Sequence, residues 1–234
     1  MRDIDSRERL IAALDVPDAD AARALAERLG DAVCFYKIGL ELFSAGGYFE
    51  LLAWLRARGA SVFADLKLYD IPETVRRAVA NLSASGASFV TVHAERSIME
   101  AAARDKGKLR ILAVTVLTSF DQRSIEEMGY AGSVQDLVLK RARAALESGC
   151  DGVIASGLEA PRIKAEFGDR LLVVVPGVRP AGAATQDQKR VVDVAQAFAN
   201  GADYIVVGRP IRDAADPRAA ALAIQNTVAA ALKR

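Results

Sequence analysis

The stretch VFADLKLYDIPETV, residues 62–75, places two carboxylates and an amine at the end of an apolar run. Asp65 and Lys67 are two residues apart, and Asp70 follows three residues later. Residues i and i+2 of a strand share a face, so Asp65 and Lys67 are expected to point into the same space. Because a buried charge is costly unless it is paired, we expect an ion-paired lysine that stays protonated. Such a lysine is able to donate a proton to a carbanion.

Other polar residues extend this group, and each also has a structural interpretation. Lys37, inside the apolar run FYKIGL, would complete an alternating array of charges. Alone, Lys37 could instead reach solvent from a strand end, and Asp70 could cap a helix that begins at Pro72. Asp15 could form a turn. His93, the one histidine of the chain, is interpreted as structural.

Short runs rich in Val, Ile and Leu predict eight strands. These runs are 10–16, 35–40, 61–68, 88–94, 109–118, 152–157, 171–178 and 204–210. Segments with helical spacing lie between them, for example 18–30, 72–86 and 133–149, where Ser133 is placed as the N-cap. A short additional helix is expected within 119–132.

Four joins from helix to strand repeat one pattern, which supports the same order. They read RGASVF, SGASFV, SGCDGV and NGADYIV, and their glycines are Gly59, Gly86, Gly149 and Gly201. Glycine at this position ends a helix in the left-handed conformation. Alternating strands and helices imply parallel strands, and eight such units fit a single-domain (β/α)₈ TIM barrel over residues 1–234. A doubly wound open sheet is the alternative, but no G-x-G-x-x-G follows the first strand.

In a (β/α)₈ barrel the active site lies at the C-terminal ends of the strands, where polar residues collect in this chain. They are Asp15, Lys37, Asp65, Lys67, His93, Thr118, Ser119, Ser156, Arg179, Gly208 and Arg209. The last two strands both end in glycine and arginine, which is typical of phosphate binding. The composition of residues 179–188 is typical of a mobile loop over an active site.

Composition narrows the classes of partner. The chain has a net charge of +1 without a block of like charges, so nucleic acid is not expected as a partner. Cys34 and Cys150 lie in or beside apolar runs and are expected to be reduced, which favours the cytoplasm. No signal peptide and no run of about 18 apolar residues is recognised, so no membrane association is expected.

Together these stretches resemble the orotidine 5′-phosphate decarboxylase family, which completes UMP biosynthesis. The matching segments, in the family's order, are ALDV (13–16), YKIGLELF (36–43), FADLKLYDIPETV (63–75), VTVLTS (114–119), VPGVRPAG (175–182), DQKR (187–190) and ADYIVVGRPI (202–211). The pattern D-x-K-x-x-D-I-P-x-T is highly specific. The chain departs from the family's pattern at two places. Tyr69 stands where histidine or phenylalanine is common, and residues 191–197 replace the more usual Thr-Pro start of a helix.

The resemblance implies an enzyme that converts orotidine 5′-phosphate to UMP without metal or organic cofactor. It implies a charged tetrad in a homodimer, with Lys67 as the proton donor to C6 and Asp65 beside the substrate carboxylate. The implied tetrad is Lys37, Asp65, Lys67 and Asp70, with Asp70 and Thr74 reaching the partner's site. The implied substrate contacts are Asp15 and Lys37 to ribose, Thr118 or its neighbour Ser119 to the pyrimidine, and Arg179, Gln188, Gly208 and Arg209 to phosphate.

Three other functions share parts of this pattern. A decarboxylase or aldolase of sugar phosphates shares such an array but usually recruits magnesium, and Ile71-Pro72 and the 179–188 loop argue against it. A phosphosugar epimerase would need several histidines. A catalytically dead nucleotide-binding barrel would bind UMP without turnover, and the intact charged residues weigh against it.

Overall fold

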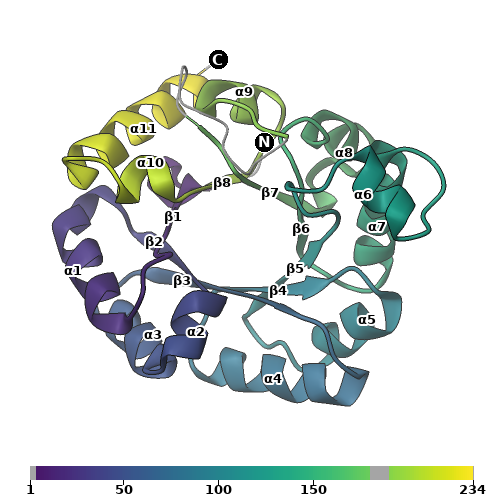
Figure 1. Ribbon diagram of the computed structural model, residues 1–234, viewed down its shortest axis with the longest axis horizontal. Coiled ribbons are helices and arrows are strands. Elements are labelled where there is room, and N and C mark those ends of the chain that lie inside the picture. The colour runs from purple at the N-terminus through teal and green to yellow at the C-terminus, as the bar shows by residue number, and fades with distance from the viewer. Residues whose placement is uncertain (1–3, 180–189, 234) are drawn as a thin grey trace.

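The protein forms a closed barrel of eight parallel strands, in a computed structural model that describes residues 4–179 and 190–233 (Figure 1). The strands are β1 (Leu10–Ala13), β2 (Phe35–Gly39), β3 (Ser61–Leu68), β4 (Phe89–His93), β5 (Arg110–Val114), β6 (Gly152–Ile154), β7 (Leu172–Pro176) and β8 (Tyr204–Val207). Each strand pairs with the next, and β8 returns to pair with β1. The barrel prediction is confirmed, and the open sheet is excluded.

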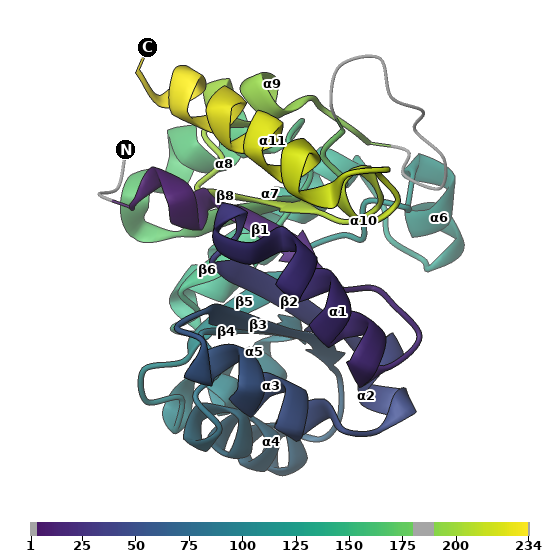
Figure 2. The same cartoon turned by 90° about the vertical axis from the view of Figure 1, so that its left-hand side faces the viewer.

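Helices surround the barrel on the outside, as Figures 1 and 2 show. They are α1 (Ala19–Leu29), α2 (Leu40–Ala45), α3 (Tyr48–Ala57), α4 (Pro72–Ala84), α5 (Arg96–Arg104), α6 (Gln122–Glu127), α7 (Val134–Glu147), α8 (Ala160–Phe167), α9 (Val194–Ala199), α10 (Arg209–Arg212) and α11 (Pro217–Leu232), with 3₁₀ turns η1 (Ser6–Arg9), η2 (Gly30–Ala32) and η3 (Gly168–Arg170). The expected extra helix is α6. The hydroxyl of Ser133 caps α7 as predicted, accepting a hydrogen bond from the Asp136 amide. None of the described helices is long and apolar enough to cross a membrane.

Alternate residues of each strand fill two different cores. Along β1, Leu10 and Ala12 pack between the barrel and the helices, whereas Ile11 and Ala13 point into the barrel. Both faces of a strand are therefore covered, which explains the nearly continuous apolar runs. Inside the barrel, aromatic rings pack at centroid distances of 4.9–6.0 Å. These rings belong to Phe35, Phe63, Phe89 and Tyr204.

The repeated helix-to-strand joins have the conformation that their glycines predict. Gly59, Gly86, Gly149 and Gly201 have φ angles between 78° and 93°. In the last two joins an aspartate follows and fixes the start of the neighbouring strand: Asp151 accepts from the Ile111 amide, and Asp203 from the Val173 amide. Asp151 pairs with Lys106 and Asp203 with Lys164. These ion pairs lie at the N-terminal ends of the strands and leave the opposite end for other polar groups.

Candidate active site

A bulge near the end of β3 positions the first two candidate residues. Ala64 pairs with Val90 and Leu68 with Val92, so three residues of β3 lie opposite Thr91 alone. Within the bulge Lys67 has a φ of 48°, the left-handed conformation that residues other than glycine rarely adopt. The expectation that Asp65 and Lys67 point the same way is met, but through this irregular backbone and not through regular strand alternation. Backbone strain of this kind is often held at functional sites.

Four charged side chains meet at this point of the barrel mouth. Lys67 Nζ lies 2.9 Å from both carboxylate oxygens of Asp65. Lys37 Nζ, from β2, lies 2.7 Å from Asp15 Oδ1 and 3.5 Å from Asp65 Oδ2. The side chains of Asp65 and Lys37 are only 13% and 11% exposed, whereas that of Lys67 is 31% exposed. The alternating array is therefore formed by this chain, with Lys67 as its most accessible ammonium group.

The neighbouring charges keep the array ionised. Burial alone would raise the pKa of Asp65, but Lys37 and Lys67 outweigh burial, so this pKa lies below its usual value. Burial alone would lower the pKa of Lys37, but Asp65 and Asp15 outweigh it and hold the pKa above its usual value. The site thus combines a persistent carboxylate with persistent ammonium charge at neutral pH.

Thr91 is a site residue that the sequence reasoning missed. Its hydroxyl donates to Asp65 Oδ1 at 2.8 Å and accepts from the Lys67 amide at 2.9 Å, and the residue is fully buried. It therefore links the carboxylate to the strained backbone of the lysine. A threonine inside an apolar strand is typical of β-structure, so only the pairing across β3 and β4 identifies its role.

Two adjoining cavities open at the C-terminal ends of the strands and share Asp15, Lys37, Pro176 and Val206. The first, of about 250 Å³, extends from the charged array to Thr118 and Ser119 in the loop after β5. Both hydroxyl residues line it, so either can contact a ligand. The residues that line this cavity are Asp15, Lys37, Phe63, Asp65, Lys67, Leu117, Thr118, Ser119, Ile154, Pro176 and Val206.

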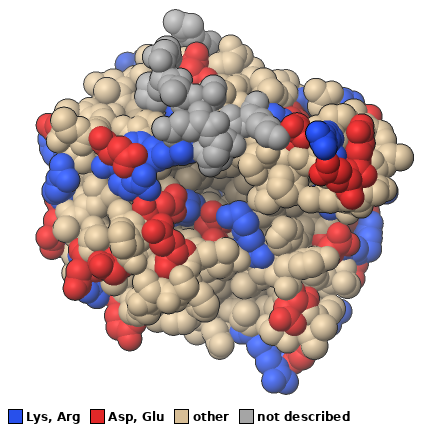
Figure 3. Space-filling view, in the orientation of Figure 1, with Lys and Arg blue, Asp and Glu red and all other residues tan. Residues whose placement is uncertain are grey.

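The second cavity, of about 420 Å³, reaches the ends of β7 and β8 and is strongly basic. Arg179, Gly208 and Arg209, the described residues for which phosphate contact is expected, line it together with Arg212. Sequence reasoning missed Arg212, although it follows Arg209 by one helical turn; it donates a 2.6 Å hydrogen bond to the carbonyl of Asp15. In Figure 3 acidic and basic side chains border the hollow on this face of the barrel.

The remaining predicted residues are not brought into these cavities by the described part of the chain. Asp70 and Thr74 are exposed, and the Asp70 carboxylate accepts from the Ile71 amide at 2.6 Å. Gln188, with the rest of residues 180–189, lies outside the described residues. His93 stands at the end of β4, where its ring packs on that of Tyr69 with centroids 5.0 Å apart.

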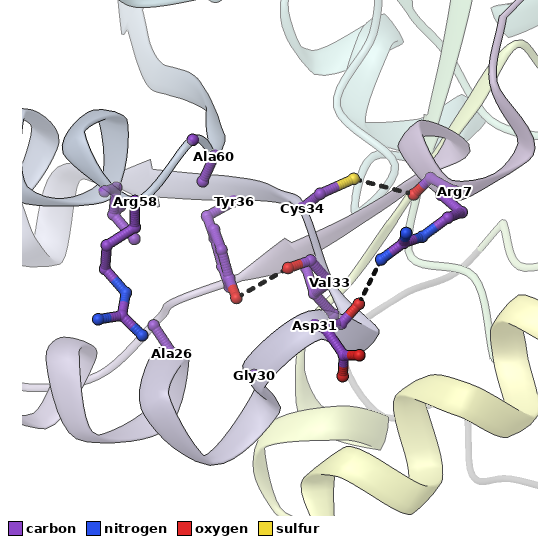
Figure 4. Close-up of a pocket in the computed structure, with 11 residues that line it drawn as sticks. Arg7, Ala26, Gly30, Asp31, Val33, Cys34, Tyr36, Arg58 and Ala60 are labelled. Carbon is purple, nitrogen blue, oxygen red and sulfur yellow. Dashed lines mark hydrogen bonds between the residues drawn. The ribbon is translucent and has the colours of Figure 1, made fainter.

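A further cavity, of about 500 Å³, lies at the other end of β2, and its polar groups have structural partners (Figure 4). The Tyr36 hydroxyl donates to the Val33 carbonyl, the Cys34 thiol to the Arg7 carbonyl, and the Arg7 guanidinium to the Asp31 carbonyl. Cys34 and Cys150 are free cysteines. Across residues 4–179 and 190–233, no group of three or more His, Cys, Asp or Glu side chains is arranged to hold a metal ion.

Comparison with known proteins agrees with the sequence resemblance. A sequence model of the orotidine 5′-phosphate decarboxylase / HUMPS family matches residues 8–224. An orotidine 5′-phosphate decarboxylase of Methylococcus capsulatus is 60% identical over 94% of this chain and 92% of its own length. One of Rhodopseudomonas palustris is 53% identical over 98% of this chain and 97% of its own length.

Solved structures agree as well. The crystal structure of orotidine 5′-phosphate decarboxylase from Lactobacillus acidophilus superimposes with a TM-score of 0.84 at 34% identity, covering 94% of this chain and 99% of that chain. The enzyme from Pyrococcus horikoshii gives a TM-score of 0.75 at 27% identity, covering 94% and 99%. Similarity of this extent shows that the chain belongs to the orotidine 5′-phosphate decarboxylase / HUMPS family.

Proposed function

We propose that this protein is a carboxy-lyase that converts orotidine 5′-phosphate to UMP, the last step of de novo pyrimidine biosynthesis. The observation that carries the proposal is the order of groups across the barrel mouth. A cavity with Arg179, Arg209 and Arg212 adjoins the Asp15–Lys37–Asp65–Lys67 array, which adjoins a cavity with Thr118 and Ser119. An anionic phosphate, a hydroxyl-bearing sugar and a polar ring fit this order.

The proposed chemical step uses Lys67 as proton donor. The bond between C6 and the carboxylate breaks, carbon dioxide leaves, and the electron pair stays on C6. The Lys67 ammonium, in place before the reaction, stabilises the developing carbanion and then transfers a proton to C6. Asp65 holds Lys67 by two contacts of 2.9 Å and would lie close to the leaving carboxylate. Protonation from solvent afterwards restores the ammonium group.

The remaining residues are assigned to binding. Lys37 and Asp15, joined at 2.7 Å, would contact the ribose hydroxyls. Thr118 or Ser119 would contact the pyrimidine. Arg179, Gly208 and Arg209 would bind the phosphate, with Gln188 as a further contact implied by the family resemblance. Binding energy from the phosphate, remote from C6, would help to align the reacting ring.

We further propose a homodimer in which Asp70 and Thr74 complete the partner's active site. Both residues are exposed, close to the barrel mouth. Several apolar side chains on the segments that follow β2 and β3 are unusually exposed, which is typical of an interaction surface. They are Leu40 at 57%, Phe43 at 49%, Phe49 at 45%, Tyr69 at 66% and Ile71 at 67% exposure. The tetrad would then contain Lys37, Asp65 and Lys67 of one subunit and Asp70 of the other.

The reaction is tested directly by ultraviolet absorbance. Purified protein is mixed with orotidine 5′-phosphate and an excess of chelator, and formation of UMP is followed. Rapid conversion is expected, because the proposed chemistry uses Lys67 and no metal ion. Binding of UMP without conversion would indicate a catalytically dead barrel. Conversion that chelator abolishes would contradict the metal-independent mechanism and favour the chemistry of sugar-phosphate enzymes.

A further inference from the structure

Arg190 and Glu159 form a buried ion pair beside the barrel mouth. Arg190 Nη1 lies 2.6 Å from Glu159 Oε1, and the two side chains are only 11% and 3% exposed. The second carboxylate oxygen of Glu159 accepts from the Ser156 amide at 3.0 Å. Glu159 is thereby fixed to the loop after β6, and the direction of the Arg190 guanidinium is set.

The other side of this guanidinium holds the loop after β5. Arg190 Nη2 donates to the carbonyls of Val116 and Leu117 at 3.1 and 3.0 Å. Arg141, on α7, donates to the carbonyl of Thr115. Three consecutive carbonyls are therefore bound by two guanidinium groups, and hydrogen bonds from a charged donor are stronger than neutral ones.

The residues next along this loop are the ligand-facing ones. Thr118 and Ser119 directly follow Leu117, and both line the cavity beside Lys67. Their position depends on the backbone that Arg190 binds, although Arg190 is not among the residues that line the cavity.

The backbone around Arg190 is itself anchored. Ser156 Oγ donates to the Arg190 carbonyl at 3.0 Å. Val192 packs so closely on Gly157 that a Cβ added at Gly157 would lie 2.3 Å from a Val192 methyl group. The Arg179 amide also donates to the Val192 carbonyl at 3.2 Å. The guanidinium thus extends from a fixed point between the ends of β5, β6 and β7.

We propose that Arg190 and Glu159 are positioning residues, which hold Thr118 and Ser119 against the base of the substrate. This inference rests on the proposed function, because that function places the pyrimidine next to Thr118 and Ser119. A buried ion pair adds little net stability compared with apolar side chains of similar volume, although removing one of its partners is costly. Here the guanidinium that Glu159 orients also binds two carbonyls of the loop after β5. A specific effect on recognition of the base is therefore expected.

The experiment compares two ligands, UMP and ribose 5-phosphate, which share the sugar phosphate and differ in the base. Dissociation constants are measured by calorimetry for wild type, Arg190→Lys and Glu159→Gln. In both variants UMP binding should weaken by about tenfold while ribose 5-phosphate binding stays within about twofold, since only the base contacts are displaced. Equal weakening for both ligands, or no change for either, would overturn the proposal.

A matched control separates positioning from stability. Lys164 and Asp203 form a second buried ion pair, 2.8 Å long with 18% and 1% exposure, at the opposite end of the barrel. Lys164→Gln should lower the melting temperature without changing the ratio of the two dissociation constants. A shift of this ratio in Lys164→Gln as large as in Arg190→Lys would show that any lost ion pair weakens base recognition, which also overturns the proposal.

A second comparison tests whether Arg190 acts through Thr118. In a Thr118→Val background, Arg190→Lys should change the UMP affinity less than it does in wild type, because the contact that it positions is already lost. If the effects of the two substitutions on the free energy of UMP binding are fully additive, Arg190 does not act through Thr118. If wild type neither produces UMP nor prefers UMP to ribose 5-phosphate, the proposed function fails as well; if wild type does both, only the positioning role is at stake.

Discussion

At the scale of single residues, the site derives its character from unequal burial within one charged cluster. Asp65 and Lys37 are nearly buried and stabilise each other's charge, while Lys67 is more open to the cavity. A proton donor has to face the substrate, whereas the groups that hold it need not. The hydroxyl of Thr91 adds a neutral link, because it bonds both the Asp65 carboxylate and the Lys67 amide.

Lys67→Ala is expected to lower kcat by at least about 10²–10⁴-fold, because both the proton donor and its electrostatic stabilisation are removed. UMP should still bind, since the arginine-lined cavity is unchanged. Steady-state assays and calorimetry check the two parts. Lys140→Ala, at an exposed lysine of α7, is the control and should match wild type. A kcat close to that of wild type in Lys67→Ala would show that Lys67 is not the proton donor.

The lowered pKa of Asp65 makes a prediction about acid stability. Because the pKa is lower in the folded state, the unfolded chain takes up the proton first, so stability falls as pH falls. Asp65→Asn should be less stable than wild type by roughly 3 kcal/mol at pH 7, since the Lys67 ammonium loses its carboxylate partner and the Lys37 ammonium keeps only Asp15. This gap should narrow below pH of about 4, near the unfolded pKa of aspartate.

Urea unfolding between pH 3 and pH 7 measures this gap. Asp20→Asn is the control, because Asp20 pairs with Arg23 while its side chain is 91% exposed, and such pairs contribute little. A gap for Asp65→Asn that stays constant from pH 7 to pH 3 would contradict the cause assigned to the pKa shift.

At the scale of elements, the site and the strand starts are positioned by the helix-to-strand joins and by the irregular part of β3 more than by the regular strands. The bulge in β3 lets Asp65 and Lys67 meet, and left-handed glycines end the helices before four strands. These glycines have similar φ angles but differ in the space around their Cα atoms. Around Gly59 an added Cβ would meet nothing within 4 Å, whereas at Gly201 it would lie 2.7 Å from Lys164 Cγ.

Gly59→Ala and Gly201→Ala are therefore expected to differ in stability. Gly59→Ala should cost about 1–2 kcal/mol, the usual penalty of a left-handed alanine. Gly201→Ala should cost about 1–3 kcal/mol more, because Lys164 must move and its ion pair with Asp203 is disturbed. Denaturant unfolding gives both values. Equal losses would show that Lys164 adjusts without cost.

At the scale of the whole molecule, closing the sheet brings the first and last strands together. Asp15 follows β1, and the cavity that it shares with Gly208 and Arg209 depends on the pairing of β1 with β8. Asp70 and Thr74 are exposed in the single chain, and in the proposed dimer they would face the partner's active site. In that dimer each active site would use residues of two chains.

Mixing two inactive variants tests the shared site. In a heterodimer of Lys67→Ala with Asp70→Asn, one site contains both intact residues, so an equal mixture should recover about a quarter of wild-type activity after random subunit exchange. Activity is measured after exchange is verified with differently tagged chains. Lys67→Ala mixed with Asp65→Asn is the control and should recover nothing, since both residues belong to one chain's site. No recovery of activity in the first mixture would indicate that Asp70 acts in the active site of its own chain.

The sequence by itself determined the order of strands and helices, the left-handed glycines, the Ser133 cap and the collection of polar residues at one end of the barrel. These features depend on local periodicity and on the general rule for strand ends. The residues that resemble the family also lie in contiguous motifs, so the amino-acid sequence is enough to recognise the family.

Only the tertiary structure decided which residues act together across the barrel. Thr91, Arg212 and Arg190 carry no local sign of their contacts, because a threonine in a strand and an arginine near a helix are common. Their partners are distant in sequence: Thr91 meets Asp65, Arg212 meets the Asp15 carbonyl, and Arg190 meets Glu159. The bulge at Lys67 was equally hidden, since strand register depends on the packing of neighbouring strands and not on the sequence of one strand.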